Sequence, residues 1–454
     1  MIKRPPEWKK KLNPDFFRRA LDSSELQKLI KHAEKEYVYW DKFKYYTPPK
    51  DFSIEEAWAF LKFSRLSNRE TAPVRDETGK SFAFTQTKIM YQKLSYIDSN
   101  TSGFLKSSLE KPSESQKSQL ILSGISEEAI ASSQIEGANT SRKIAKEMIL
   151  SQRKPRTVDE QMIINNYQVM QRLMDWKDLS LNKEMLLEIQ KNITTNTLKN
   201  EKDAGRFRQD ADNIQIVDSL TGDIAFTPPS EKIFLNELNR LIKFANTEEP
   251  EEEFLHPVIK ASILHFWIAY LHPFVDGNGR TARAIFYWYL LRKNYWLFQY
   301  LSVSRAIKMS RAQYDEAFLK TELDDNDLTY FIIYKAKVIG ESIEAFVSHY
   351  QKKLKEFERN EILSRQLVDL NERQIALLYS LDKSSGKNID IKTHKTKNQI
   401  AYQTARADLI KLSKRGLLTQ LANNKKYIYV PNNAAIKKLL NVPRPESKLP
   451  KTFN

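Results

Sequence analysis

The strongest constraint on the fold is a pair of apolar segments separated by a short loop. Apolar residues recur at helical spacing through 257–271, and a proline at the start of this segment suits a first helical turn. Residues 273–279 interrupt the pattern with a proline and two glycines, and a second apolar series follows through 280–291. The sequence therefore predicts two buried helices, with His272 at the end of the first and the loop at the start of the second.

The loop gathers residue types that suit a polyphosphate. It joins the imidazole of His272, the carboxylate of Asp276, two glycines and two arginines within twelve residues, although the chain has only 11 glycines in 454 residues. Backbone N–H groups at a helix start favour an anion, and glycine lets the backbone approach it closely. Each residue alone has an ordinary structural explanation. Their combination at this spacing predicts a nucleotide site.

The stretch from His272 to Arg283 resembles the core motif of Fic-domain proteins, His-x-Phe-x-Asp/Glu-Gly-Asn-Gly-Arg-x-x-Arg, at every defined position. The resemblance extends over about residues 120–345 and implies a mainly helical bundle that transfers AMP from ATP to a hydroxyl group of a target protein. Doc-type kinases of the same superfamily have a shorter, altered loop. The complete motif therefore favours nucleotidyl transfer over phosphorylation.

The resemblance also implies a role for each motif residue. His272 would be the general base that deprotonates a Ser, Thr or Tyr hydroxyl, and Asp276 would hold Mg²⁺ between the phosphates. The residues that would bind ATP are Gly277, Asn278, Gly279, Arg280 and Arg283. Many family members have an asparagine against adenine where this chain has Ser310, which leaves ATP and other nucleotides open as donors.

A second motif lies about 140 residues upstream of the first. The segment Ser132–Gly137 resembles the inhibitory motif of the family, Ser/Thr-x-x-x-Glu-Gly/Asn. Ser132 and Glu136 are four residues apart, so one face of a helix would carry both. The resemblance implies that Glu136 pairs with Arg283 in the space that the γ-phosphate needs. Its place before the core motif resembles the class with an N-terminal inhibitory helix (class II).

A hairpin is predicted between the two motifs. Two short β-prone runs, 214–218 and 224–226, surround a turn that contains Gly222. The region from about 205 to 228 resembles the flap that docks an extended target segment in this family, and an ordinary surface hairpin is the alternative. The residues expected to contact the target are Asn213, Ile214, Gln215, Ile216 and Val217.

Helical spacing elsewhere predicts a mainly α fold in several parts. Residues 1–118 read as an N-terminal helical region with a Ser- and Lys-rich connector at 102–118. Within this region, Ser53-Ile54-Glu55-Glu56 resembles a helix start. The Fic-like domain would occupy 119–346, with the inhibitory helix at about 125–137 and the core motif at 272–283. A long charged helix at roughly 327–359, with the linker at 347–360, would lead to a winged helix-turn-helix at 361–435. The order predicted there is helix, helix and hairpin, with a basic segment at 392–397. Residues 436–454, rich in proline, are expected to be disordered.

The last part of the chain is strongly basic. Residues 351–454 hold 22 Lys and Arg against 9 Asp and Glu, which accounts for most of the net charge of +16. A winged helix of this charge suits DNA, whereas a solvated surface or a protein-docking module explains the charge equally well. The candidate DNA contacts are Gln403, Thr404, Arg406 and Lys425.

The sequence as a whole predicts an autoinhibited protein adenylyltransferase that uses ATP and Mg²⁺. Removal of AMP by means of Glu136, or a DNA-binding regulator that senses nucleotide, are the alternatives. No apolar run of membrane-spanning length and no secretory signal are evident, and the chain has no cysteine, so a cytoplasmic protein is expected. The sequence does not identify the target protein, and it leaves open whether the chain forms a homodimer.

Overall fold

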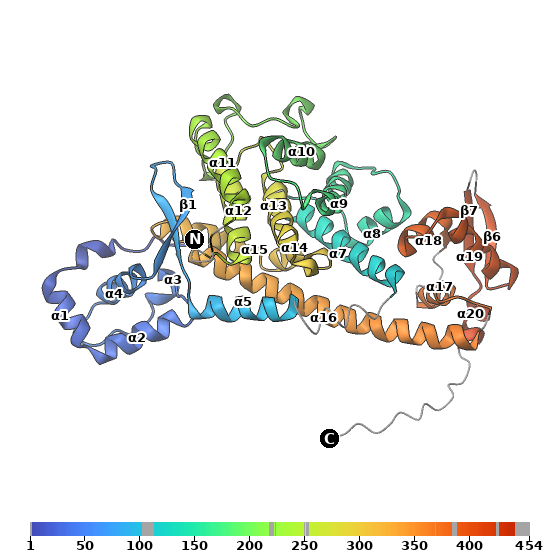
Figure 1. Cartoon of the computed structure of the whole chain (residues 1–454), viewed down its shortest axis with the longest axis horizontal. Coiled ribbons are helices and arrows are strands. Elements are labelled where there is room, and N and C mark those ends of the chain that lie inside the picture. Colours follow the sequence, from blue (N-terminus) through green and yellow to red (C-terminus); the bar gives the residue numbers. More distant parts are fainter. Residues whose placement is uncertain are drawn as a thin grey trace, which may run out of the picture. The chain divides into compact units, whose positions relative to one another are not determined.

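The computed structural model describes residues 2–101, 113–217, 222, 224–248, 250, 254–367, 369–383, 388–423 and 426–440. Helices dominate the described chain, as the sequence predicts (Figure 1). Contacts divide the chain into two compact units: the first unit is 1–108, 124–141 and 155–346, and the second unit is 109–123, 142–154 and 347–454. Among the described residues, no helix is long and apolar enough to cross a membrane.

Short helices and a hairpin begin the first unit. They are η1 (Trp8–Lys11), α1 (Pro14–Asp22), α2 (Ser24–Glu34), α3 (Trp40–Phe43), α4 (Ile54–Leu66), β1 (Arg69–Arg75), β2 (Ser81–Thr85) and α5 (Lys88–Thr101). The predicted start of α4 is confirmed, because Ser53 and Glu56 form a reciprocal capping box. Strands β1 and β2 pair antiparallel. Aromatic side chains, among them Phe16, Phe43 and Trp58, fill the core of this region.

Buried and partly buried polar contacts join this N-terminal region to the loop that precedes α16 (Thr329–Gln366). The Trp8 indole donates to Asp325 at 2.7 Å, and the Tyr37 hydroxyl donates to Asp327 at 2.7 Å. Lys62 and Asp324, both buried, form an ion pair at 2.9 Å. Such contacts span more than two hundred residues of sequence, so composition alone does not reveal them. The first unit therefore includes residues 1–108, which the sequence separates from the Fic-like domain.

Two buried helices form the centre of the first unit. They are α12 (Pro257–Leu271) and α13 (Asn278–Arg292), which pack along each other and bury nearly all their side chains. The covering helices are α7 (Glu114–Ile135), α9 (Val158–Trp176), α10 (Lys183–Thr194) and α11 (Glu231–Asn246). The remaining elements are η2 (Glu201–Asp203), η3 (Asp210–Asp212), β3 (Ile216–Val217), β4 (Ile224–Phe226), η5 (Trp296–Gln299), α14 (Val303–Met309) and α15 (Arg311–Leu323).

The second unit contains a three-stranded sheet between helices. Its elements are α8 (Arg142–Ser151), α17 (Glu372–Lys383), β5 (Ile389–Asp390), α18 (Ile391–Asn398), α19 (Tyr402–Lys414), β6 (Leu418–Asn423), β7 (Lys426–Pro431) and α20 (Asn433–Leu440). The strand order is β5-β7-β6, and both pairs are antiparallel. The predicted order of helix, helix and hairpin is present. The sequence marked 392–397 only as basic, but Asp390 caps a helix there.

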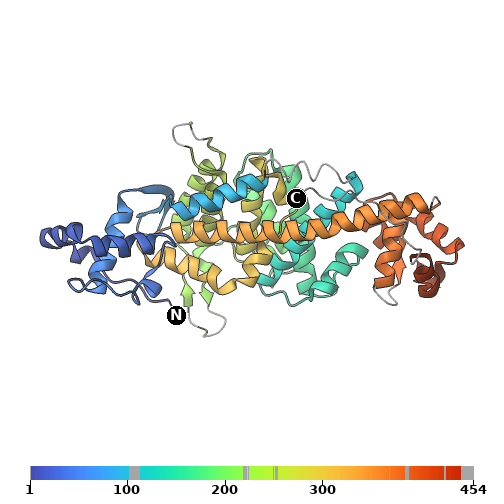
Figure 2. The ribbon, with the colours of Figure 1, turned by 90° about the horizontal axis from the view of Figure 1, so that it is seen from below.

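Several predicted boundaries differ from the structure. Helix α7 begins at Glu114, so the last residues of the predicted connector and the predicted inhibitory helix belong to one longer helix. Residues 102–112 of that connector lie outside the described residues, as does the predicted disordered tail from 441 onward. The predicted linker helix at 347–360 is part of α16, which runs unbroken from Thr329 to Gln366 (orange in Figure 2). The long charged helix predicted at roughly 327–359 is thereby confirmed, and it continues to Gln366.

Candidate active site

The predicted position of His272 at the end of a helix is confirmed. His272 caps α12 in the left-handed region, with φ of 49°, and its N–H donates to the Ile268 carbonyl at 3.0 Å. A residue other than glycine in this region is strained, and such strain collects at functional sites. Arg208 stabilises the turn, because its guanidinium donates to the carbonyls of Leu271, His272 and Pro229. The helix end thereby gains the donor that its own last turn lacks.

The His272 ring is partly buried, and its surroundings favour the neutral form. Burial, the largest effect, lowers the pKa of His272 to about 4, against the opposing effects of its bond to Ala269 and the charge of Glu136. Nδ1 lies 3.4 Å from the Ala269 carbonyl oxygen. Because a carbonyl only accepts, Nδ1 carries the proton in this contact, and Nε2 keeps its lone pair.

The loop between α12 and α13 is fixed by its own side chains and by α10. The Asn278 side chain accepts from the Phe274 N–H at 2.9 Å and donates to the Phe274 carbonyl at 2.8 Å. Gly277 caps α13 with φ of 86°, and a Cβ there would lie 3.0 Å from the Thr194 methyl group. The buried Gln190 donates to the Asp276 carbonyl at 3.1 Å. The Asn278 side chain therefore shapes the loop from inside.

Asp276 presents its carboxylate at the surface of the loop. Its side chain is 51% exposed, and Oδ1 accepts from the Gly277 N–H at 2.6 Å. Arg280 lies one turn further on, with Nη2 at 3.4 Å from Oδ2. No cluster of three or more metal-ligating side chains occurs among the described residues. Any cation here would therefore take most of its ligands from a bound nucleotide or water.

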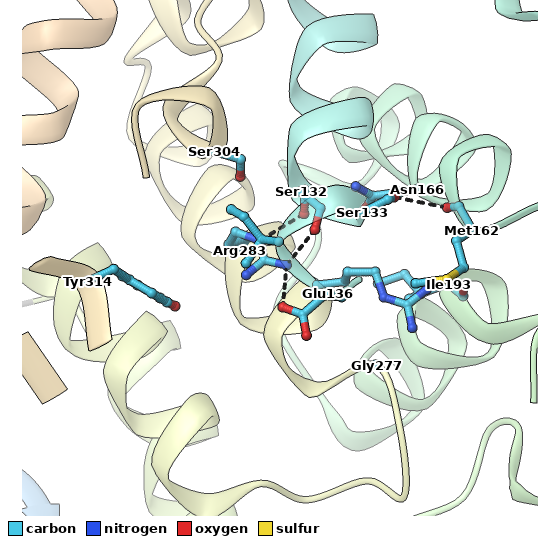
Figure 3. Close-up of polar contacts among 12 residues, drawn as sticks. Ser132, Ser133, Glu136, Met162, Asn166, Ile193, Gly277, Arg283, Ser304 and Tyr314 are labelled. Carbon is cyan, nitrogen blue, oxygen red and sulfur yellow. Dashed lines mark hydrogen bonds and ion pairs between the residues drawn. The ribbon is translucent and has the colours of Figure 1, made fainter. Parts of the chain in front are cut away.

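The two arginines of the loop face different partners. Arg280 donates through Nη1 to the Ile193 carbonyl at 3.1 Å. Arg283 donates through Nε to the Ser132 hydroxyl at 2.8 Å and through Nη2 to Glu136 at 2.8 Å and to the Ser132 carbonyl at 3.1 Å (Figure 3). The predicted shared face of Ser132 and Glu136 is confirmed by these contacts. Burial lowers the pKa of Arg280. Burial also acts against the charge of Arg283, but the neighbouring Glu136 carboxylate outweighs it and raises the pKa of Arg283.

Glu136 is held where α7 ends. The Ala138 N–H donates to the Ser133 carbonyl at 3.1 Å and the Gly137 N–H donates to the Gln134 carbonyl at 3.2 Å, which is the Schellman pattern. Gly137 has φ of 98°, as this turn requires. The turn directs the Glu136 carboxylate toward the first turn of α13, where a Cβ added to Gly279 would lie 2.2 Å from Oε1. Although burial opposes ionisation, the charge and hydrogen bond of Arg283 lower the pKa of Glu136.

A sequence-family comparison matches this arrangement. The model of the Fic/DOC family matches residues 180–290, which contain α10, α12, the loop and most of α13. Residues 180–290 form a Fic domain. The protein adenylyltransferase Fic of Nematostella vectensis is 26% identical over 121 residues, which cover 27% of this chain and 26% of that protein. The protein adenylyltransferase fic-1 of Caenorhabditis elegans is 30% identical over 122 residues, covering 27% and 22%.

The chain spans about a quarter of the length of these curated relatives. Among solved structures, a Fic family protein from Desulfovibrio desulfuricans G20 has a TM-score of 0.48 at 16% identity, covering 77% of this chain and 98% of that one. Fic-1 (residues 134–508) from C. elegans has a TM-score of 0.44 at 20% identity, covering 57% and 71%.

The predicted hairpin between the two motifs is present. Strands β3 and β4 pair antiparallel, and the turn residues 218–221 and 223 lie outside the described residues. Along the predicted docking segment, Asn213, Gln215 and Val217 are exposed and alternate with the partly buried Ile214 and Ile216. This alternation is typical of a strand with one free face. Only two of the five residues form a ladder with β4.

Arg208 and Gln190 support the Fic loop without having been predicted to do so. The last turn of α12 has no basic residue that could donate to its final carbonyls. The sequence therefore indicates that another residue must donate to them, but it does not identify Arg208. Gln190 joins the loop to the segment before the flap, because its Oε1 accepts from the Gly205 N–H at 2.6 Å. Ser310 is engaged internally, since its hydroxyl contacts the Ala306 carbonyl and the Tyr334 hydroxyl, each at 2.9 Å.

The second unit carries a separate basic surface on α19. Gln403, Thr404 and Arg406 are exposed there, whereas Lys425 lies outside the described residues. Residues 391–440 contain eleven Lys and Arg but a single acid, Asp408, which is buried. Hydrogen bonds from His394, Asn371 and Arg373 overcome the effect of burial and lower the pKa of Asp408 to about 2. No acidic side chain of this segment therefore offsets the exposed positive charge.

Proposed function

We propose that this chain is an autoinhibited protein adenylyltransferase that transfers AMP from ATP to a Ser, Thr or Tyr hydroxyl of a target protein. The single observation that carries this proposal is the pairing of Glu136 with Arg283 beside a neutral His272. The Fic domain and the names of its curated relatives support nucleotidyl transfer. The Glu136–Arg283 ion pair supports inhibition by default.

The proposed reaction is an in-line displacement at the α-phosphorus of ATP. Nε2 of His272 takes the proton of the target hydroxyl while its oxygen bonds to the α-phosphorus. The bond from that phosphorus to the bridging oxygen breaks, and pyrophosphate leaves with the electron pair. Arg280 and Arg283 stabilise the charge on this leaving group. The low pKa of His272 keeps the base unprotonated before the target binds.

The surroundings of α13 suit nucleotide phosphates. Arg280 Nε and Arg283 Nη1 are buried and find no hydrogen-bond partner among the described residues. Buried donors of this kind are costly unless an acceptor is supplied. The Glu136 carboxylate stands in for a phosphate at the first turn of α13, between Gly279 and Arg283. Because one anion fits there at a time, Glu136 would hinder the productive placement of ATP.

Asp276 fits a magnesium ion bound together with nucleotide. Its exposed carboxylate supplies one oxygen ligand, and Mg²⁺ commonly takes one or two carboxylates together with substrate phosphates. When bound, the ion would neutralise phosphate charge. The exposed face of the flap would receive an extended target segment by strand addition, which would select targets loosely by sequence.

The activity should stay nearly constant from pH 7.5 to pH 5.5. His272 works as a base only when neutral, and its pKa of about 4 lies below this range. The Glu136 charge raises the pKa of His272, so replacing Glu136 by glycine would lower this pKa further and keep it below the tested range. We expect kcat/KM of Glu136→Gly to fall only below about pH 5, whereas a histidine with a pKa of about 6.5 would lose roughly tenfold. The measurement is labelled AMP incorporation in buffers of constant ionic strength.

A tenfold loss of kcat/KM by pH 5.5 would contradict the buried, neutral base. The stability of the protein over the same range serves as the control, since partial unfolding would also reduce the rate. Circular dichroism at each pH separates these causes.

The exposed basic face of α19 supports a second function, binding of duplex DNA through a winged helix. The element order of the second unit and the lack of an exposed acid in 391–440 favour a polyanion that accepts a helix in its groove. A solvated surface or a protein-docking module would carry the same charge, but it would not show salt-dependent binding of a duplex. This function is independent of AMP transfer.

Binding of a duplex should weaken steeply as salt rises, with log K falling by about 0.9 per phosphate neutralised for each unit of log salt concentration. We expect Arg406→Glu to weaken binding by about tenfold or more, because Arg406 is exposed on α19. Fluorescence anisotropy with random and selected duplexes measures both effects. Lys438→Glu, the same charge change on exposed α20, is the matched control. Equal losses in both variants, or no binding at low salt, would exclude a groove-binding α19.

A further inference from the structure

Every carbonyl in the last turn of α7 has a donor, and two of the donors are arginine side chains. The two middle carbonyls accept from backbone N–H groups of the turn that follows. The Ser132 carbonyl accepts from Arg283 Nη2 at 3.1 Å, and the Ile135 carbonyl accepts from Arg311 Nη1 at 2.8 Å. The end of a helix carries partial negative charge and unpaired carbonyls, so cations there stabilise it. Arg311 therefore caps α7 one residue before Glu136.

Lys308 and Arg311 lie together where α14 ends and α15 begins. Nζ of Lys308 donates to Gln134 Oε1 at 2.6 Å, and Nε2 of the same glutamine donates to the Thr140 carbonyl at 2.8 Å. These contacts bridge the chain on both sides of Glu136, because Gln134 precedes it and Thr140 follows it. All five residues belong to the first unit. The corner between α14 and α15 therefore stabilises the segment that carries Glu136.

The rest of α7 within the first unit is fixed by its packing. The buried Glu128 accepts from the Tyr287 hydroxyl at 2.8 Å and from the Ser304 N–H at 2.9 Å. A Cβ on Gly124 would lie 2.4 Å from the Tyr300 carbonyl oxygen, so the helix has no lateral freedom there. Movement of the inhibitory carboxylate therefore falls on the last turn of the helix and on the loop after it.

The two arginines at the end of α7 differ in what else they contact. Arg283 is buried and is one of the proposed phosphate ligands. The Arg311 side chain is 49% exposed, and its other hydrogen bonds go to Asp315 on the same helix. Burial, the largest effect, raises the pKa of Glu136, whereas the charges of Arg283 and, more weakly, Arg311 lower it. Arg311 thus favours the inhibitory position of Glu136 from outside the site.

We propose that Arg311 is a positioning residue for inhibition: by binding the end of α7 it keeps Glu136 on Arg283. Lys308 supports it through Gln134. This role rests on the proposed adenylyltransferase activity. When the cap is absent, the last turn of α7 opens more often, Glu136 leaves Arg283, and ATP binds productively. Arg311 acts only through the position of Glu136.

Replacing Arg311 by alanine leaves the Ile135 carbonyl to water and should raise AMP incorporation by about twofold to fivefold, the effect of a cation at an exposed helix end. Amide hydrogen exchange in 134–141 should become faster, because the last turn opens more often. Arg311→Lys, which keeps the positive charge, should give a smaller rise. Adding Lys308→Ala to Arg311→Ala should raise incorporation and exchange further. Labelled ATP with Mg²⁺ and exchange followed by mass spectrometry measure both effects.

Arg172→Ala is the matched control, because Arg172 is an exposed arginine on α9 that pairs with Glu188. It should change neither incorporation nor exchange in 134–141. In the Glu136→Gly background, Arg311→Ala should have no further effect on incorporation, since the carboxylate that it positions is gone. Thermal unfolding verifies that each variant is folded.

The outcomes separate this role from the proposed function. If Glu136→Gly labels protein while Arg311→Ala matches the unmodified protein in both labelling and exchange, the positioning role is excluded. A change of labelling by Arg311→Ala in the Glu136→Gly background would also exclude it, because Arg311 would then act on the substrates. If Glu136→Gly labels no protein, adenylyl transfer fails, and exchange in 134–141 still decides whether Arg311 stabilises the end of α7.

Discussion

Replacing Glu136 by glycine should raise AMP incorporation into protein by about tenfold to a hundredfold. The change removes a charge-assisted contact of 2.8 Å to Arg283, and such contacts contribute about 1.5–3 kcal/mol. It also clears the space over Gly279, where the carboxylate oxygen now lies. Labelled ATP with Mg²⁺ and intact-mass spectrometry measure the rise, and the mass shift identifies the group transferred.

Two further variants isolate the cause of that rise. Glu136→Gln keeps the size of the side chain but removes its charge, so it should give an intermediate gain if charge pairing holds Arg283. Ser132→Ala removes only the 2.8 Å contact to Arg283 Nε and should give a small gain. Unchanged labelling in Glu136→Gly would exclude inhibition by this residue. Release of AMP from a modified target by the unmodified protein, but not by Glu136→Gly, would instead indicate that Glu136 assists AMP removal.

Replacing His272 by alanine in the Glu136→Gly background should lower AMP incorporation by about a hundredfold to ten-thousandfold. His265, on the helix that His272 ends, cannot take its place, because it is buried against Tyr314 and Lys335. Retained binding of ATP, measured by calorimetry, would show that the loss concerns the reaction and not the site. Initial rates at saturating ATP give the size of the effect.

His32→Ala is the matched control, since His32 is exposed and lies in the N-terminal region. It should leave the rate unchanged. If His272→Ala kept more than about a tenth of the rate, another group would be the base. A loss of ATP binding in His272→Ala would assign His272 to the architecture of the loop, whose left-handed turn it forms.

The local parts of the fold were predictable because their signals are short-range. Pro257, the glycines of the loop and the apolar spacing set the ends of α12 and α13 within a few residues. The capping box at Ser53 did the same for α4. Long-range contacts left no such signal: the Trp8–Asp325 and Lys62–Asp324 pairs join the N-terminal region to the loop that precedes α16 through residues that are ordinary in sequence.

The candidate site was predictable where one motif holds the residues together. The spacing of Ser132 and Glu136 correctly placed both on one helical face, and the structure brings them to Arg283. The support from Arg208 and Gln190 was not predictable, since each acts on backbone carbonyls that carry no sequence signature. The two-unit membership of α7 left no sequence signal either, because the helix runs unbroken through the boundary between the units.

In the proposed function, the Schellman turn that holds Glu136 would make the inhibitor part of the same chain as the active site. A tethered ligand has an effective concentration set by the chain, and dilution of the protein does not change it. Glycine 137 faces open space, so a change in its backbone conformation displaces no side chain. The free energy needed to open this one turn would thus set how readily ATP binds productively. Because Glu136 is tethered, ATP would compete with it equally at every protein concentration.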